Sequence, residues 1–220
     1  MSKPGLPSNE IDDRYHVTHD AMTGLLNRRG LDERLDYLID RYPGGFAVLM
    51  IDLDDVKRTN DLEGHDMGDS LIKQAADAIG EVTRQEDVDP GDDRELDTLA
   101  LGRLSEAART GGDEFILPLP GVDDLEKLVI VRERVDERLA KAGINASIGG
   151  AVHENGMDAS GLLSRADAEM YIDKDDRKIN RQSEIQISVI KHIGTLIAEH
   201  EINPHDIPAV LAALDRRQDS

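Results

Sequence analysis

The sequence predicts an α/β (α+β) fold in which a central mixed sheet is covered by helices. A short, wholly apolar run at residues 46–51 indicates a strand that is buried on both faces. Residues 107–119 have the pattern of a β-hairpin with a tight turn at Gly111 and Gly112. Segments with helical spacing of apolar residues alternate with these strands, which favours one sheet packed under helices.

The first half of the chain begins with a predicted helix at residues 23–41, because its apolar residues recur at helical spacing and a Pro-Gly-Gly run follows. After the buried strand, residues 64–68 predict a loop and residues 70–82 a second helix. Residues 85–105 are rich in turn formers and acidic side chains, which predicts an acidic surface insertion with a short helix near residues 95–104.

The second half follows the hairpin with an amphipathic helix at residues 124–140 and a strand of small residues at 144–152. Three helices are predicted after it, at residues 159–173, 184–200 and 207–214. The last two lie in a C-terminal helical tail, whose apolar stripe either packs on its own domain or meets a partner chain.

Composition narrows the classes of function. With 220 residues, the chain is long enough for one domain with an extension, and the absence of cysteine excludes disulfides and thiolate metal sites. A formal net charge of −20 repels nucleic acid and anionic membranes. The longest apolar stretch is too short to span a bilayer, and the first ten residues show no secretory signal. We therefore expect a cytoplasmic protein with no nucleic-acid or membrane partner.

Acidic side chains gather at two points, on two strand elements that we expect to be neighbours. Asp52 and Asp54 leave the end of the buried strand and point the same way, because side chains alternate along a strand. Asp113 and Glu114 follow two glycines at the hairpin tip, where a ligand can approach the backbone closely. Carboxylates from two neighbouring strands suit two-metal phosphoryl or nucleotidyl transfer with Mg²⁺. Ordinary polar residues after a strand and a plain acidic turn are the alternatives.

Two further groups are candidates for nucleotide binding. The segment 60–69 offers an Asn amide and Asp carboxylates, which together can read the edge of guanine. Adenine presents the opposite pattern of donors and would leave these groups unpaired. Lys174 and Lys178 lie one helical turn apart and could neutralise a triphosphate, and the alternative is a solvated basic helix end favoured by the macrodipole.

In their order along the chain, these residues resemble the GGDEF family of diguanylate cyclases. The resemblance covers roughly residues 18–180. The matching pieces are residues 20–29 (DAMTGLLNRR), 51–54 (IDLD) with Lys57, Asn60, Asp61, Gly64, His65, Gly68 and Asp69, then 109–115 (RTGGDEF), 147–149 (SIG) and 166–171 (ADAEMY) with Lys174.

The resemblance implies a nucleotidyl-cyclase, palm-like fold and a reaction. Two GTP-loaded subunits meet as a homodimer, and each 3′-hydroxyl attacks the α-phosphate of the other nucleotide, giving cyclic di-GMP and two pyrophosphates. It also implies site residues. The ligands of Mg²⁺, or of Mn²⁺ in its place, are Asp52, the Leu53 carbonyl, Asp113 and Glu114. Asp113 and Glu114 are the catalytic residues, with Asp113 helping to deprotonate the 3′-hydroxyl.

The remaining implied residues bind the substrate GTP. Asn60 and Asp69 read guanine with His65 nearby, and Lys57, Lys174 and Lys178 contact phosphate. Asp69 favours guanine, because some relatives that accept ATP carry a small residue at this position.

Several departures from the family pattern leave alternatives open. Asp55 adds an acid beside the triphosphate, and the usual Gly-Arg-Asn run after Lys174 is altered around Lys178. The stretch between Asp69 and Gly111, which contains the insertion 85–105, is longer than usual. Gly102 and Ser105 stand where a product-inhibition motif would be, which predicts no feedback through the usual site. An inactive module that binds GTP or a cyclic dinucleotide to regulate a partner is the main alternative, and a cyclase with another product is the second.

The expected organisation has three parts. A lead-in segment covers residues 1–17, the catalytic domain residues 18–180, and the tail residues 181–220.

Overall fold

The computed structural model describes residues 17–82 and 107–198, with two compact units at Met1–Lys174 and Asp175–Ser220. Several predictions fall outside the described residues. These are nearly all of the lead-in segment 1–17, the acidic insertion 85–105 with its short helix and altered inhibition motif, and the last helix at 207–214.

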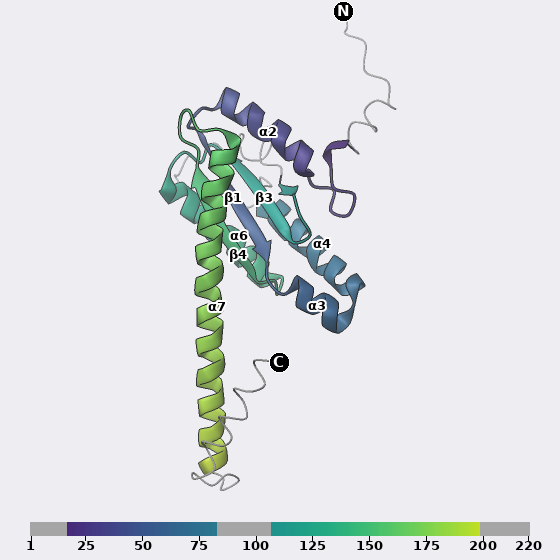
Figure 1. Cartoon of the computed structure of the whole chain (residues 1–220), viewed down its shortest axis with the longest axis vertical. Coiled ribbons are helices and arrows are strands. Elements are labelled where there is room, and N and C mark those ends of the chain that lie inside the picture. The colour runs from purple at the N-terminus through teal and green to yellow at the C-terminus, as the bar shows by residue number, and fades with distance from the viewer. Residues whose placement is uncertain (1–16, 83–106, 199–220) are drawn as a thin grey trace, which may run out of the picture. The chain divides into compact units, whose positions relative to one another are not determined.

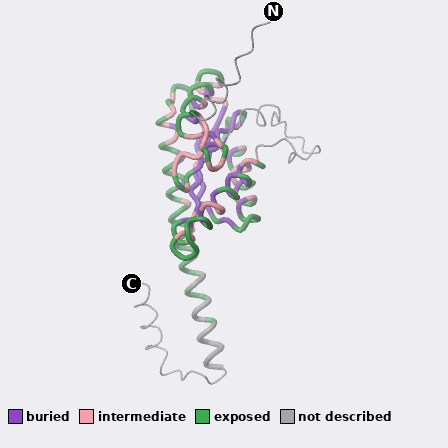
Figure 2. The backbone as a smooth tube through the Cα atoms, turned by 90° about the vertical axis from the view of Figure 1, so that its right-hand side faces the viewer, coloured by how far each residue is buried: buried purple, intermediate pink, exposed green. Residues whose placement is uncertain are grey.

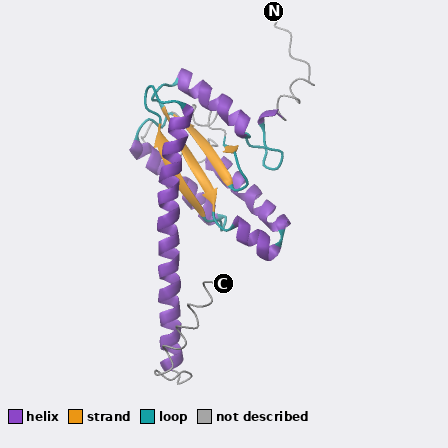
Figure 3. Cartoon of the chain, viewed as in Figure 1, coloured by secondary structure: helices purple, strands orange, loops and turns teal. Residues whose placement is uncertain are grey.

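The first unit is built on a four-stranded sheet in the order β2-β3-β1-β4 (Figures 1 and 3). The strands are β1 (Phe46–Leu53), β2 (Ala108–Arg109), β3 (Glu114–Pro120) and β4 (Ala146–Val152). Among the described residues every ladder between these strands is antiparallel, and parallel pairing is limited to an isolated bridge between Leu26 and Ala108.

The expectation of a mixed sheet therefore needs correction. The hairpin inserts β3 between β2 and β1, so that strands running in the same direction are not neighbours. The rest of the fold class is confirmed, because helices cover the sheet and the elements alternate as the sequence predicts.

Helices cover both faces of the sheet. On one face, alternate residues of β1 pack with α4 (His65–Val82) and α6 (Leu125–Lys141). On the other face, Phe46 and Val48 pack with α2 (Arg28–Arg41) and the first part of α7 (Ala159–Ala198). Figure 2 shows the buried residues gathered along this sheet. Burial of both faces explains why β1 has no polar residue before Asp52.

The region around β1 departs from the prediction in four ways. Helix α2 starts at Arg28, because the Asn27 side chain accepts the Gly30 N–H at 3.0 Å and caps the helix there. Strand β1 extends to Leu53. Helix α3 (Val56–Glu63) was not predicted, and α4 starts at His65 after a single glycine, Gly64, where a loop was expected.

The helices predicted at 159–173 and 184–200 form a single helix, α7. No glycine or proline lies between residues 173 and 184, so nothing in the sequence ends the helix there. In the described part of the chain, no helix is both long and apolar enough to cross a membrane.

Candidate active site

The site lies where β1 ends. Asp52 is the last side chain of β1 on the face that α7 covers, and only 9% of the residue is exposed. Its Oδ1 accepts a hydrogen bond from Lys174 Nζ of α7 at 2.7 Å. Two residues on, Asp54 Oδ1 accepts the Ser147 hydroxyl at 3.1 Å. A buried carboxylate is therefore held at the strand end by a charged partner from a distant helix.

The tip of the β2–β3 hairpin meets the same strand end. The Leu53 N–H donates to the Asp113 carbonyl at 3.0 Å, and Asp52 stands opposite Glu114 in the ladder between β1 and β3. Residues that pair directly across a ladder point to the same face. The structure thus brings together Asp52, Leu53, Asp113 and Glu114, as the sequence predicts.

The local charge at this point is strongly negative, and Lys174 offsets it. The hydrogen bond to Asp52 raises the pKa of Lys174 above its ordinary value, and the negative charges of Asp54 and Asp113 add to this effect. The ammonium group therefore occupies the position that a cation would favour. The carboxylates of Asp52, Asp54 and Asp113 attract the Lys174 ammonium to this position. Because carboxylate oxygens are hard ligands, the same groups also fit a divalent cation.

A divalent cation here would depend on its substrate for some of its ligands. The described residues contain no ready-made group of three or more histidine, aspartate or glutamate side chains that could hold a metal ion. Mg²⁺ is usually bound by one or two carboxylates together with water and the phosphates of a nucleotide. Asp52 and Asp113, with the Leu53 carbonyl, fit that mode of binding.

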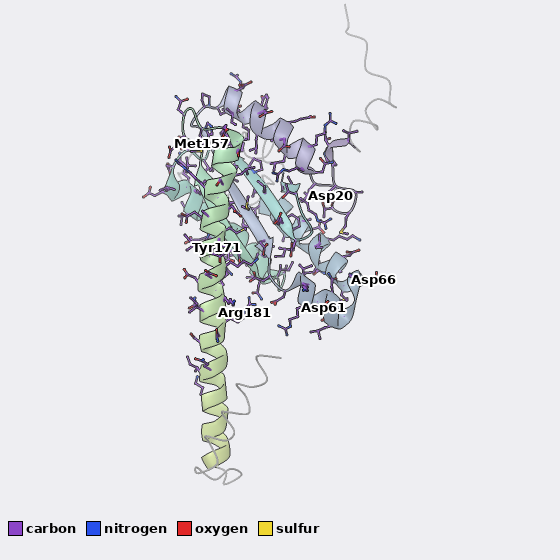
Figure 4. The ribbon with its side chains drawn as sticks, in the orientation of Figure 1. Asp20, Asp61, Asp66, Met157, Tyr171 and Arg181 are labelled. Carbon is purple, nitrogen blue, oxygen red and sulfur yellow. The ribbon has the colours of Figure 1, made fainter. Side chains whose placement is uncertain are left out.

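A second cluster fixes the hairpin tip. The Arg109 guanidinium donates to the Gly112 carbonyl at 2.8 and 3.2 Å and to Asp20 Oδ1 at 3.2 Å. Asp20 Oδ1 also accepts the backbone N–H and the hydroxyl of Thr23. The peptide that precedes Asp113 is thereby tied to the loop before α2, where Figure 4 labels Asp20.

The Asp20 cluster predicts a pH effect on stability. Burial acts to raise the pKa of Asp20, but the hydrogen bonds from Thr23 and the charge of Arg109 outweigh it and hold the pKa below the ordinary 3.8. Because the pKa of Asp20 is lower in the folded than in the unfolded state, ionised Asp20 stabilises the fold at pH values above the unfolded-state pKa. This stabilisation is lost as the pH falls through the folded-state pKa. The free energy of unfolding of Asp20→Asn should therefore fall below that of the natural protein at pH 7, and the difference should shrink as the pH falls through the lowered pKa of Asp20.

Urea unfolding of both proteins from pH 7 downwards measures this difference. Asp32→Asn, at an exposed i,i+4 pair with Arg28, serves as the control and should show little difference at any pH. A constant gap between Asp20→Asn and the natural protein across the whole range would contradict the prediction.

The candidate base-reading residues lie on α3 and α4, where Figure 4 labels Asp61 and Asp66. Asn60 Oδ1 is buried and has no hydrogen-bond partner among the residues that the structure describes. It lies against Gly68, where an added Cβ would be 2.0 Å from this oxygen. A buried acceptor without a partner is costly, which indicates a site where a ligand supplies the missing donor.

The other predicted substrate-binding residues are half-buried or exposed. Asp69 is half-buried on α4, whereas His65 at the start of α4 and Lys57 on α3 are exposed. Lys57 lines a depression of about 580 Å³ together with Asp55, Arg58, Asp61 and Leu62. Lys178 lies four residues after Lys174 on α7 but belongs to the second unit, so its contact with phosphate stays a prediction.

Sequence reasoning missed two contributors to the site. Asp20 and Arg109 were part of the resemblance but had no role, and because they lie 89 residues apart no local pattern pairs them. Arg132 and Asp173 form a second ion pair beside Lys174 and were not identified. They lie 41 residues apart, and no local pattern connects them.

The chain is similar to known proteins both in sequence and in structure. A family model described as "Diguanylate cyclase, GGDEF domain" matches residues 17–89. A bifunctional diguanylate cyclase/cyclic di-GMP phosphodiesterase, MucR of Pseudomonas aeruginosa, is 29% identical over 215 residues, which are 88% of this chain and 29% of that protein. The chain thus spans less than a third of the length of this curated relative.

Two solved structures from Caulobacter crescentus are similar over most of their length. A sensory box/GGDEF family protein is 33% identical with a TM-score of 0.57, covering 72% of this chain and 99% of that one. The coiled coil and GGDEF domain of DgcB, in complex with c-di-GMP, is 25% identical with a TM-score of 0.61, covering 76% of this chain and 86% of that one.

Proposed function

This chain belongs to the GGDEF family of diguanylate cyclase domains, and we propose that it is an active diguanylate cyclase that condenses two GTP molecules into cyclic di-GMP. The observation that carries the proposal is the contact between the end of β1 and the hairpin tip. There the buried Asp52, the Asp113 peptide and the Lys174 ammonium converge. An enzyme that uses GTP acts where GTP is available, so we expect it in the cytoplasm.

The acidic residues would hold the catalytic ions. Asp52, Asp113 and the Leu53 carbonyl are the proposed ligands of one Mg²⁺, and Glu114 is the proposed ligand of a second. Bound Mg²⁺ supplies charge neutralisation for the triphosphate and lowers the pKa of the attacking hydroxyl. Asp113 then accepts the 3′-hydroxyl proton, while Lys57 and Lys174 orient the phosphates. Binding of the triphosphate draws Lys174 from Asp52 towards phosphate oxygens.

The reaction needs two copies of the domain. The 3′-oxygen of each GTP forms a bond to the α-phosphorus of the other, and the bond from that phosphorus to pyrophosphate breaks. Repeating the step closes the ring and releases two pyrophosphates. Since each copy supplies one nucleotide, the rate per protein should rise with protein concentration.

Guanine selection is proposed for Asn60 and Asp69, with His65 nearby. The unpartnered Asn60 Oδ1 supports this, because it can accept a hydrogen bond from a guanine N–H. The Asp69 carboxylate can accept from the ring N–H and the exocyclic amine, whereas adenine offers no such pair of donors.

Gly68→Ala should lower the kcat/KM for GTP about 10- to 100-fold, since the new methyl group would displace Asn60 Oδ1 from its position 2.0 Å away. It should also reduce the preference for GTP over ITP, which lacks the exocyclic amine. Steady-state kinetics with both nucleotides measures the two effects. Lys73→Ala removes an exposed side chain of the same helix and serves as the control. An unchanged preference in Gly68→Ala would exclude Asn60 from base reading.

The test of the function is direct. Purified protein is incubated with GTP, ATP or both in the presence of Mg²⁺, and the products are identified by mass spectrometry at several protein concentrations. Cyclic di-GMP from GTP alone is the expected result. A mixed or linear product would replace the proposal with another cyclase activity. Nucleotide binding without any product at high protein concentration would replace it with a regulatory binding module.

A further inference from the structure

One turn of α7 lies directly on the backbone of β4. A Cβ added at Gly149 would lie 2.0 Å from Met170 N and 2.3 Å from Ala166 O, which are both backbone atoms. Helix and strand therefore touch without a side chain between them, at the turn that Tyr171 marks in Figure 4. This contact fixes how close the helix lies, but it leaves open how the turn is rotated and how far it slides along the strand.

The ion pair between Arg132 and Asp173 fixes both the rotation of this turn and its position along the strand. Asp173 Oδ2 accepts the Ile148 N–H at 2.9 Å, and Arg132 Nε donates to the Ile148 carbonyl at 3.0 Å. Arg132 Nη2 also donates to Asp173 Oδ1 at 2.5 Å, which joins the two side chains directly. In the described part of the chain β4 is an edge strand, so these side chains bond both polar groups of Ile148 as a neighbouring strand would.

The ion pair between Arg132 and Asp173 is partly shielded from solvent. The Asp173 side chain is 17% exposed and that of Arg132 is 34% exposed. Charge-assisted hydrogen bonds of this kind are stronger and more directional than those at a fully exposed surface. The turn of α7 at Asp173 is therefore held in one orientation.

The orientation matters because Lys174 is the next residue. Asp173 contacts Ile148, and Lys174 contacts Asp52, which pairs with the neighbouring Ser147 in the ladder between β1 and β4. Successive side chains on a helix diverge by about 100°. A turn that rotates or slides would consequently carry the Lys174 ammonium away from the carboxylates.

We propose that Asp173, held by Arg132, is a positioning residue that sets where the Lys174 ammonium lies in the active site. The proposal rests on the proposed function, in which Lys174 binds the triphosphate of GTP. Asp173 and Arg132 act through Lys174 and need not touch the nucleotide themselves.

A double-mutant cycle tests this coupling. The Kd of a GTP analogue with a methylene group between the α- and β-phosphates is measured with Mg²⁺ by calorimetry. Asp173→Ala and Lys174→Met should each raise the Kd about tenfold, the scale expected for one lost charge-assisted contact. The double variant should bind no worse than Lys174→Met alone. Independent effects that multiply in the double variant would overturn the proposal.

The control is Glu154→Ala. It removes the exposed ion pair between Glu154, in the loop after β4, and Arg165 on α7, and it should leave the Kd unchanged. If Asp173→Ala does not fold, Arg132→Lys gives the milder test. This change keeps the charge but loses the fork that bonds Asp173 and Ile148 together, and it should raise the Kd about threefold. An unchanged Kd in Arg132→Lys would overturn the proposal.

A second readout does not depend on GTP. The ¹⁵N ammonium signal of Lys174 is identified by its loss in Lys174→Met. In Asp173→Ala it should move to the position of a freely solvated lysine, because the bond to Asp52 is lost. An unchanged ammonium signal would overturn the positioning role even if the protein makes cyclic di-GMP. Conversely, if the natural protein neither binds the analogue nor forms product, the proposed function fails while this signal still decides the role of Asp173.

Discussion

Asp113→Ala should reduce cyclic di-GMP formation by about a thousandfold or more, because it removes at once a proposed metal ligand and the proposed acceptor of the 3′-hydroxyl proton. The fold should not change. The bond that joins the hairpin tip to β1 uses the backbone carbonyl of Asp113, and alanine keeps that carbonyl. Product formation, followed by mass spectrometry, should therefore collapse while the midpoint of thermal unfolding stays the same.

A matched variant separates this effect from a general loss of negative charge. Asp167→Ala removes an exposed carboxylate from α7 and should retain full activity. Binding of Mn²⁺ together with GTP, measured by electron paramagnetic resonance, should weaken in Asp113→Ala only. A folded Asp113→Ala protein that still makes product at the natural rate would remove this residue from the catalytic role.

Gly149→Ala should give the largest loss of stability. The three atoms nearest to the new methyl group, Met170 N, Ala166 O and Met170 Cα at 2.6 Å or less, all belong to the backbone of α7, so the helix as a whole must move. Overpacking that cannot relax through side chains costs about 3 kcal/mol or more, which corresponds to a fall in the unfolding midpoint of roughly 10 °C. Urea unfolding and thermal melting measure these values.

The neighbouring glycine provides the comparison. At Gly150 the three atoms nearest to the added methyl group belong to side chains, Leu49 Cδ2 at 2.8 Å and Leu128 Cδ1 and Cδ2 at 3.2 Å, and these can shift. Gly150→Ala should therefore cost about 1 kcal/mol. If Gly149→Ala proves as stable as Gly150→Ala, the close contact between α7 and β4 is not as described.

The sequence was sufficient to predict that the acidic end of β1 and the hairpin tip lie together. The wholly apolar run before Asp52 predicts a strand buried on both faces, and the two glycines before Asp113 predict a hairpin tip. Because a buried strand and a hairpin in one small sheet are close neighbours, their acidic ends were expected to meet. The contact between Leu53 and Asp113 agrees with this expectation, which rests on local patterns of burial and turn formation.

Other parts could not be predicted, and each has a physical reason. Helix α3 buries only Val56, so it has no apolar stripe that would reveal helical spacing. The antiparallel sheet depends on where the hairpin is inserted, which is a property of the tertiary fold. Asp173 and Arg132 each look like ordinary surface charges on amphipathic helices, and only the folded chain shows that they share the peptide of Ile148.

The bonded peptide of Ile148 also bears on how the protein behaves in concentrated solution. An uncovered sheet edge invites strands of other molecules to add to it and begins aggregation. Here the middle of β4 is closed by an ion pair and by a helix that lies against the backbone. Encounters between copies should therefore not proceed through this edge, which leaves the face with the proposed nucleotide site available for reversible pairing even at high protein concentration.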